Sequence, residues 1–292
     1  IADEGVVAFR VLPNGSLARL NSAKIKGMRG CHLSTSKADD YIFISGFHDG
    51  KITVLHLNED GSVGDIADGV FHKGLGSVAE RSFRPHVSCS RLTPDERFLM
   101  VADLGIDQIK VYRFDHKDGK IALVDTIRCE LESAPKYFMF SSDGRFFYVL
   151  YEMKNVIEVY SYKEGERVPI VEKIQTISST GSKPNQLTAA CAMHFSPDEK
   201  HVFCSNAGDN TVSMYDRDDE TGMLTLRFCL PISGDYPKDI AIFPGGEHLA
   251  SINHEGSISF FKIDYEKGLL VMSDRSIKVN EPNCCEIVKI GD

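Results

Sequence analysis

The most constraining feature of this chain is a motif that repeats five times. Each copy has an apolar stretch, a tight turn, an aromatic-rich stretch, a polar loop and a stretch resembling Val-x-Val-Tyr. The plainest copy is Ala134–Gly165, and the others span Pro85–Ile121, Gln186–Leu224, Pro237–Leu270 and, less clearly, Gly30–Val63. One small sheet cannot bury its faces alone and must stack on neighbouring sheets. An all-β repeat of this period therefore predicts a β-propeller.

The tight turn of each copy contains one position that needs a positive φ angle, which glycine adopts most easily. Successive turn positions are 57, 48, 55 and 47 residues apart. The five residues at this position are Asp39, Glu96, Gly144, Glu199 and Gly246.

The copy around Gly144 predicts four antiparallel strands per blade. We expect strands at Tyr137–Phe140, Arg145–Tyr151 and Val156–Tyr162, because these stretches are apolar or alternate apolar with polar residues. A fourth strand is expected over Val168–Ile174. Its Pro169 is tolerable because the outermost strand of a blade is an edge strand.

The two ends of the chain match only parts of a blade. Val6–Val11 and the turn at Pro13-Asn14-Gly15 resemble a third strand and its outer turn, and Pro282–Ile290 resembles an innermost strand. A ring closed by both ends has no exposed sheet edge. We therefore expect a single seven-bladed domain over 1–292, truncated at its N-terminus by roughly one repeat. Its parts are a partial blade 1–29, blades at about 30–84, 85–133, 134–183, 184–235 and 236–280, and a closing strand 281–292.

Composition argues against several classes of protein. The net charge is −9 and the pI is about 5.6, which does not favour a nucleic-acid partner. No apolar run approaches the ~18 residues of a membrane span. The eight cysteines form no CxxC pair and lie mostly in apolar stretches, so we expect reduced, mostly buried thiols in a cytoplasmic protein.

The hairpin of the first two strands predicts where a site would form. The start of the first strand and the end of the second meet opposite the tight turn, beside the central channel, where propeller sites collect. Counting eight residues to either side of each turn position predicts five facing pairs. They are Cys31/Phe47, Ser88/Leu104, Lys136/Glu152, Cys191/Ala207 and Lys238/His254.

Lys136 and Glu152 form the most informative of these pairs. A carboxylate in a narrow mouth can act as a general base on water, and an ammonium group can neutralise an oxyanion or bind a phosphate. Lys238 and His254 offer a second cationic patch. On geometry alone, an ion pair that only stabilises the hairpin is the better interpretation of Lys136 and Glu152.

His86 and His32 lie near strand starts on the same face, where a histidine is more often structural than catalytic. No spacing of His, Cys or Asp resembles a zinc site. The sequence also lacks a glycine-rich phosphate loop and a nucleophile elbow.

The repeats resemble the seven-bladed lactonase family, which contains bacterial 6-phosphogluconolactonase and fungal 3-carboxy-cis,cis-muconate lactonizing enzyme. The resemblance covers essentially the whole chain. It is carried by PHVSCSRLTPDERFLMVADLGIDQIKVYRFD, APKYFMFSSDGRFFYVLYE, MHFSPDEKHVFCSNAGDNTVSMYD and YPKDIAIFPGGEHLASINHEGSISFFKID. It implies hydrolysis of 6-phosphoglucono-lactone to 6-phosphogluconate, a step of the pentose phosphate pathway, or a related lactone reaction. It also implies that the reaction needs no metal and no organic cofactor.

The resemblance also implies site residues. The family glutamate falls on Glu152, and a family arginine falls on Lys136, which keeps the charge but not the guanidinium fork. A family histidine falls on Ser88, with His86 two residues before it. A second family arginine falls on Ala207, after Asn206.

One main function and two alternatives follow from this pattern. The first is a lactone hydrolase with a partly altered site, in which Glu152, Lys136 and His86 are catalytic. Its substrate-binding residues are predicted to be Ser88, Lys238, His254, Asn206 and His32. The alternatives are a non-catalytic propeller that acts as a ligand-binding or interaction scaffold, and a muconate-type lactonizing enzyme. The expected partner is a small anionic sugar lactone, and the expected state is a monomer or weak homodimer.

Overall fold

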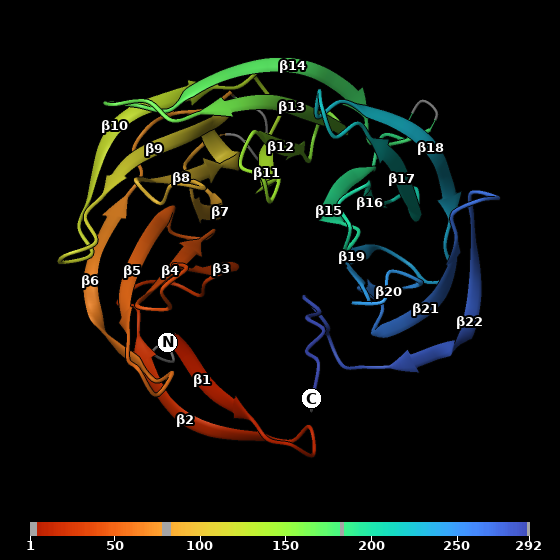
Figure 1. The fold of residues 1–292 in the computed structure, drawn as a ribbon, viewed down its shortest axis with the longest axis horizontal. Helices are drawn as coiled ribbons and strands as arrows, with labels where there is room; N and C mark the ends of the chain where they lie inside the picture. The colour runs from red at the N-terminus through yellow and green to blue at the C-terminus, as the bar shows by residue number, and fades with distance from the viewer. Residues whose placement is uncertain (1–4, 78–82, 182–183, 291–292) are drawn as a thin grey trace. The chain divides into compact units, whose positions relative to one another are not determined.

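The computed structural model describes residues 5–77, 83–181 and 184–290 of the 292-residue chain. Within these ranges it contains 22 β-strands and one short 3-10 helix, η1 (Leu104–Ile106). The strands form five four-stranded antiparallel sheets and one two-stranded sheet (Figure 1). The described residues include no helix long and apolar enough to span a membrane. The predicted all-β class with four-stranded antiparallel blades is confirmed.

The chain divides into two compact units. Unit 1 contains residues 1–136, 163–170 and 290–292, and unit 2 contains 137–162 and 171–289. The boundary passes through the first strand of the third four-stranded sheet. The prediction of one domain over 1–292 stays a prediction.

Unit 1 holds the two-stranded sheet and two complete four-stranded sheets, in which the strands neighbour one another in chain order. The strands are β1 (Gly5–Val11), β2 (Leu17–Lys24), β3 (His32–Thr35), β4 (Tyr41–Gly46), β5 (Lys51–Leu57), β6 (Val63–Phe71), β7 (Val87–Leu92), β8 (Phe98–Asp103), β9 (Gln108–Phe114) and β10 (Ile121–Arg128).

Unit 2 holds most of the third four-stranded sheet and all of the last two. The third sheet contains β11 (Pro135–Phe140), β12 (Phe146–Tyr151), β13 (Val156–Lys163) and β14 (Ile170–Ser178). The last two contain β15 (Ala189–Phe195), β16 (His201–Ala207), β17 (Thr211–Arg217), β18 (Leu224–Pro231), β19 (Pro237–Ile242), β20 (His248–Asn253), β21 (Ser257–Asp264) and β22 (Leu269–Lys278).

The core of each unit lies between successive sheets. In unit 1, Ile42 and Ile44 of β4 pack with residues of β2, whereas Tyr41 and Phe43 of the same strand pack with residues of the next sheet. Successive side chains of a strand point to opposite faces, so a strand buried on both faces must be apolar throughout. β16 of unit 2 repeats this arrangement, with Val202 on one side and Phe203 on the other.

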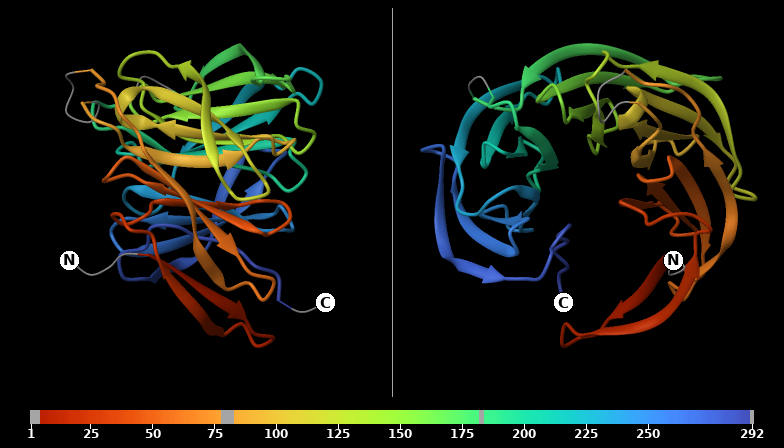
Figure 2. Two further views of the ribbon diagram at one scale, coloured as in Figure 1. Left: turned by 90° about the vertical axis from the view of Figure 1, so that its left-hand side faces the viewer. Right: turned by 180° about the vertical axis from the view of Figure 1, so that it is seen from behind.

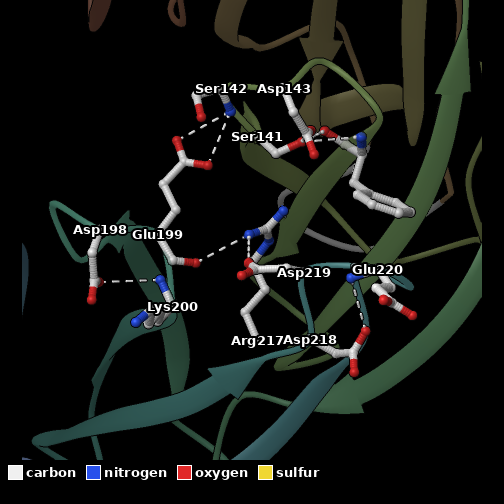
Figure 3. A network of polar contacts seen from close by, with 12 residues as sticks. Ser141, Ser142, Asp143, Asp198, Glu199, Lys200, Arg217, Asp218, Asp219 and Glu220 are labelled. Carbon is white, nitrogen blue, oxygen red and sulfur yellow. Dashed lines mark hydrogen bonds and ion pairs between the residues drawn. The ribbon is translucent and has the colours of Figure 1, made fainter.

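The tight turns have the predicted left-handed backbone. The φ angles at Asp39, Glu96, Gly144, Glu199 and Gly246 are 52°, 54°, 70°, 54° and 76°. In unit 2 the turns at Gly144 and Glu199 belong to a polar network, in which the buried Arg217 donates to the Glu199 carbonyl and to Asp219 (Figure 3). Arg217 also donates to the Tyr148 hydroxyl. The network links the turns of two neighbouring sheets.

A second left-handed position recurs just before each third strand. Asp107, Asn155 and Asn210 have φ angles of 51°, 53° and 54°. Asp107 accepts hydrogen bonds from the backbone N–H groups of Glu132 and Ala134 at 2.8 Å. The short polar side chain therefore tolerates the left-handed backbone and fixes the loop that leads to the next sheet.

The predicted facing pairs are wrong in three sheets, because each first strand contains a β-bulge. The extra residues are Ser88, Cys191 and Lys238. Ala207 pairs with Ala189 instead of Cys191. The backbone N–H of Leu104 donates to His86, and that of His254 donates to Tyr236. A bulge sets two residues against one and so shifts the register.

The remaining two pairs have different outcomes. The backbone N–H of Cys31 donates to Ser45, so Cys31 does not face Phe47 as predicted. The pairing of Lys136 with Glu152 stays a prediction.

The predictions for the two ends of the chain have different outcomes. The N-terminal stretch forms an antiparallel pair, β1 with β2, shown from two further sides in Figure 2. The predicted closing strand over 281–292 is wrong in its described part, because residues 281–290 form no strand. This segment is held by side-chain contacts instead of a ladder: Cys285 N–H donates to Asp239, and Lys238 donates to Asn283.

All eight cysteines are free thiols, but the prediction that most are buried is wrong. Cys89, Cys191 and Cys204 are buried. The others lie at loops, strand ends or the outer strand β18, where a small apolar side chain is only partly covered.

Candidate functional site

The candidate residues lie at one end of the strands of each sheet, where the first strand begins and the second strand ends. We call this end of the sheet the mouth edge, which is distinct from its edge strands. The bulged residues Ser88 and Lys238 lie there, and Lys136 holds the corresponding position of β11. Bulges bend the strand and re-aim one side chain, which suits positions that must present a functional group.

In unit 1, the structure brings Ser88, Cys31 and Lys136 together. The Ser88 hydroxyl donates to the Pro135 carbonyl at 3.0 Å, and the Cys31 thiol donates to the Val87 carbonyl at 3.4 Å. Cys31 is exposed as a residue, but its sulfur is shielded from water, which raises the pKa of the thiol to about 12; Lys136 acts in the opposite direction. The Lys136 ammonium group therefore lies near a thiol that stays protonated.

His86 is buried and directly precedes β7, the strand that contains Ser88. Its Nδ1 lies 2.7 Å from the Phe47 carbonyl oxygen, and its ring stacks on Phe47 with centroids 4.4 Å apart. A carbonyl oxygen can only accept, so Nδ1 carries the hydrogen.

His32 has internal partners. Its Nδ1 accepts from the Ser90 backbone at 3.4 Å, and its Nε2 lies 3.6 Å from the Cys89 sulfur. Burial, together with the Arg91 charge, lowers the pKa of His32 to about 3. A neutral ring held in this way does not attract an anion, so we leave His32 out of the proposed substrate contacts.

In unit 2, Glu152 directly follows β12 and is only 7% exposed. Its backbone carbonyl accepts from Ala190 N–H at 3.3 Å. The residues eight positions after the other four turns are Phe47, Leu104, Ala207 and His254, so Glu152 is the one carboxylate among these five. A nearly buried carboxylate at such an edge is a candidate proton acceptor.

Lys238 and His254 lie at the mouth edge of the last sheet. Lys238 donates to the Asn283 side chain at 2.9 Å, and the exposed His254 packs against Tyr236 with ring centroids 5.7 Å apart. The two residues are therefore not cross-strand partners, but both are accessible to a ligand at this edge.

Asn206 has a structural role. It is fully buried, and its amide donates to the Ser179 carbonyl at 2.8 Å and to the Thr211 hydroxyl at 3.2 Å. These bonds fix the loop before β15, so the amide is not available to bind substrate.

Sequence reasoning missed two buried aspartates at the mouth edge. Asp103 accepts from His72 at 2.7 Å, and Asp239 accepts from His194 at 3.1 Å. Asp239 follows the bulged Lys238, and Asp103 ends a strand in the stretch Asp-Leu-Gly. The sequence signal that could have revealed Asp103 is an apolar stretch, typical of a buried strand, that ends in a carboxylate.

Among residues 5–77, 83–181 and 184–290, no group of three or more His, Cys, Asp or Glu side chains is arranged to hold a metal ion.

Comparison with known proteins identifies the family. Residues 2–287 match the family described as "Lactonase, 7-bladed beta-propeller". A 6-phosphogluconolactonase of Bacillus subtilis is 26% identical, over 97% of this chain and 80% of the relative.

Two solved structures are also similar. One is a Bacteroides fragilis protein with a TM-score of 0.87 and 29% identity, over 98% of this chain and 80% of the other. The second is the periplasmic gluconolactonase of Pseudomonas aeruginosa, with a TM-score of 0.90 and 23% identity, over 98% of this chain and 80% of the other. At this identity the similarity supports the fold alone. This chain belongs to the lactonase family of seven-bladed β-propellers.

Proposed function

We propose that this protein hydrolyses a small anionic sugar lactone, and that 6-phosphoglucono-lactone is the substrate to test first. The observation that carries the proposal is the match of residues 2–287 to a lactonase family. The nearly buried carboxylate of Glu152 at a mouth edge supports it. The name of the Bacillus subtilis relative supports the choice of lactone.

The proposed reaction needs one base and one cation. Water adds to the lactone carbonyl carbon while Glu152 accepts a proton from that water. The carbonyl oxygen becomes an oxyanion, which Lys136 neutralises. The bond from that carbon to the ring oxygen then breaks. The ring oxygen takes the proton from Glu152 and becomes a hydroxyl. The new carboxylic acid group releases its proton to water, so the product is a carboxylate.

The cationic residues support an anionic substrate. Lys136 lies near Cys31 and Ser88 in unit 1, and Lys238 lies at the mouth edge of the last sheet. An ammonium group binds phosphate as a point charge, with no need for the guanidinium fork. We further propose a cytoplasmic enzyme that works without a cofactor, as a monomer or weak homodimer.

The test measures the rate at which the 292-residue protein hydrolyses 6-phosphoglucono-δ-lactone. The rate is monitored through the release of protons and is corrected for spontaneous hydrolysis. We expect saturable activity in the wild type and at least a hundredfold lower kcat in Glu152→Gln, which keeps the shape but cannot accept the proton. Glu255→Gln, which changes an exposed glutamate after β20, is the matched control and should be fully active. Absence of saturable activity, or a fully active Glu152→Gln, contradicts the proposal.

A further inference from the structure

The side chain of His86 is oriented by two contacts of its ring. Nδ1 donates to the Phe47 carbonyl, and the ring lies against Phe47 at an interplanar angle of 22°. Phe83 meets the ring edge-on, with centroids 6.4 Å apart. Among the described residues, Nε2 has no hydrogen-bond partner. In the neutral ring this atom is an acceptor.

The backbone of His86 is held by Asp103, which is fully buried. One carboxylate oxygen, Oδ1, accepts from His86 N–H at 2.8 Å and from Gly105 N–H at 3.2 Å. The His86 carbonyl in turn accepts from Leu104 N–H at 3.0 Å. Asp103 therefore joins the start of β7 to the end of β8.

The second carboxylate oxygen of Asp103 is occupied by His72. Its Nδ1 lies 2.7 Å from Oδ2, and neither side chain has any exposed surface. Burial lowers the pKa of His72, an effect that Asp103 opposes and Lys110 reinforces. His72 is therefore a neutral donor that holds Asp103 in one orientation.

Gly105 makes room for this arrangement. A Cβ atom at this position would lie 1.9 Å from the Arg84 carbonyl oxygen and 2.7 Å from Cδ2 of His86. Real Cβ atoms do not approach so closely, so any larger residue here must displace the segment that carries His86.

From these contacts we infer that Asp103 is a positioning residue, which together with Gly105 presents Nε2 of His86 as an acceptor for a substrate hydroxyl. Asp103 and Gly105 fix the backbone at His86, and Phe47 fixes its ring. Among the described residues, only Nε2 of this ring is left without a hydrogen-bond partner. A sugar lactone carries several hydroxyl groups that can donate to such an atom. The functional part of this inference rests on the proposed lactone hydrolysis, whereas the orientation of the ring does not.

The orientation is tested by ¹⁵N-detected NMR of the histidine rings in the 292-residue protein at pH 8. We expect His86 with hydrogen on Nδ1 and a bare Nε2, and a changed or averaged His86 signal in Asp103→Asn and in Gly105→Ala. Asp107→Asn is the matched control, because Asp107 is equally buried and also accepts backbone N–H groups, but not that of His86. Hydrogen on Nε2 in the wild type, or a signal unchanged in Asp103→Asn, overturns the orientation.

The role toward substrate is tested with two lactones. For glucono-δ-lactone we expect Asp103→Asn to lower kcat/KM about tenfold, the effect of one hydrogen bond. For δ-valerolactone, which has no hydroxyl, we expect no change. Equal losses on both lactones would make Asp103 merely structural and overturn the role. A wild type inactive on every lactone overturns the proposed function and with it this role, while the NMR result still decides the orientation.

Discussion

The two carboxylate oxygens of Glu199 share one bifurcated hydrogen bond from the backbone N–H of Ser142, at 3.0 and 3.1 Å (Figure 3). The two residues belong to the tight turns of neighbouring sheets, and Glu199 itself has a φ angle of 54°. Glu96 repeats the arrangement in unit 1, where it accepts from Lys37 N–H at 2.6 Å. These contacts explain why two turn positions that favour glycine hold glutamate.

Replacing Glu199 should separate backbone strain from the lost contact. Glu199→Ala keeps the left-handed strain and loses the bond to Ser142, so we expect a loss of ~1–2 kcal/mol in the free energy of unfolding. Glu199→Gly should lose ~1 kcal/mol less, because glycine adopts this φ angle without strain. Urea unfolding measures both. Equal losses would mean that the left-handed backbone carries no strain.

Removing the Arg217 side chain should strongly destabilise the network in Figure 3. Its guanidinium group is buried and bonds to Tyr148, Asp219 and Glu199, so Arg217→Met leaves several polar groups unpaired. We expect a loss of ~2–4 kcal/mol by urea unfolding. Arg227→Met, at an exposed arginine on the same sheet, is the control and should lose less than ~1 kcal/mol. Similar losses in both variants would contradict a structural role of the network.

Stability should fall when the pH drops below about 6.5. The pKa of His32 is lowered to about 3 and that of His72 is also lowered, so both are neutral in the folded protein. The unfolded chain takes up these protons near pH 6.5, so the unfolded state binds more protons and gains stability as the pH falls. Urea midpoints at pH 8, 7, 6 and 5 measure this effect.

A variant without His72 tests whether the histidines cause this loss of stability at low pH. His72→Gln cannot titrate, and its midpoint should therefore fall less between pH 7 and 5 than that of the wild type. The groups that face His72 are Asp103, Lys110 and Tyr112, and the glutamine amide can still donate to Asp103. A midpoint that does not change between pH 8 and 5 in the wild type would show that neither histidine is held neutral.

Charge, more than the shape of the cation, should matter at Lys136. For a phosphorylated lactone, Lys136→Met should raise KM or lower kcat so that kcat/KM falls at least tenfold, because the anion partner is lost. Lys136→Arg should retain activity. Lys117→Met removes the same charge from an exposed turn of unit 1 and should have no effect. A fully active Lys136→Met would remove this residue from the proposed site.

The thiols should divide into two classes. Cys89, Cys191 and Cys204 are buried, so at most five of the eight cysteines should react with a thiol reagent in the native protein at pH 7. All eight should react in denaturant. A total below eight in denaturant would reveal a disulfide bond that the structure does not contain.

The strands and turns of this protein could be predicted from local sequence, because each depends on neighbouring residues. Alternation of apolar residues located the strands, and the turn chemistry located Asp39, Glu96, Gly144, Glu199 and Gly246, all of which have positive φ angles. The position of Glu152 directly after a second strand followed from the same count.

The sequence alone did not determine the contacts between strands and loops. The bulges at Ser88, Cys191 and Lys238 shift the pairing, and a bulge depends on how the partner strand and the neighbouring sheet pack. Asn206 proved to be internal because a loop 27 residues earlier in the chain covers it. Asp103 gained its role only when folding brought His72 and His86 to its two oxygens, since their separations in the chain, 31 and 17 residues, carry no local signal.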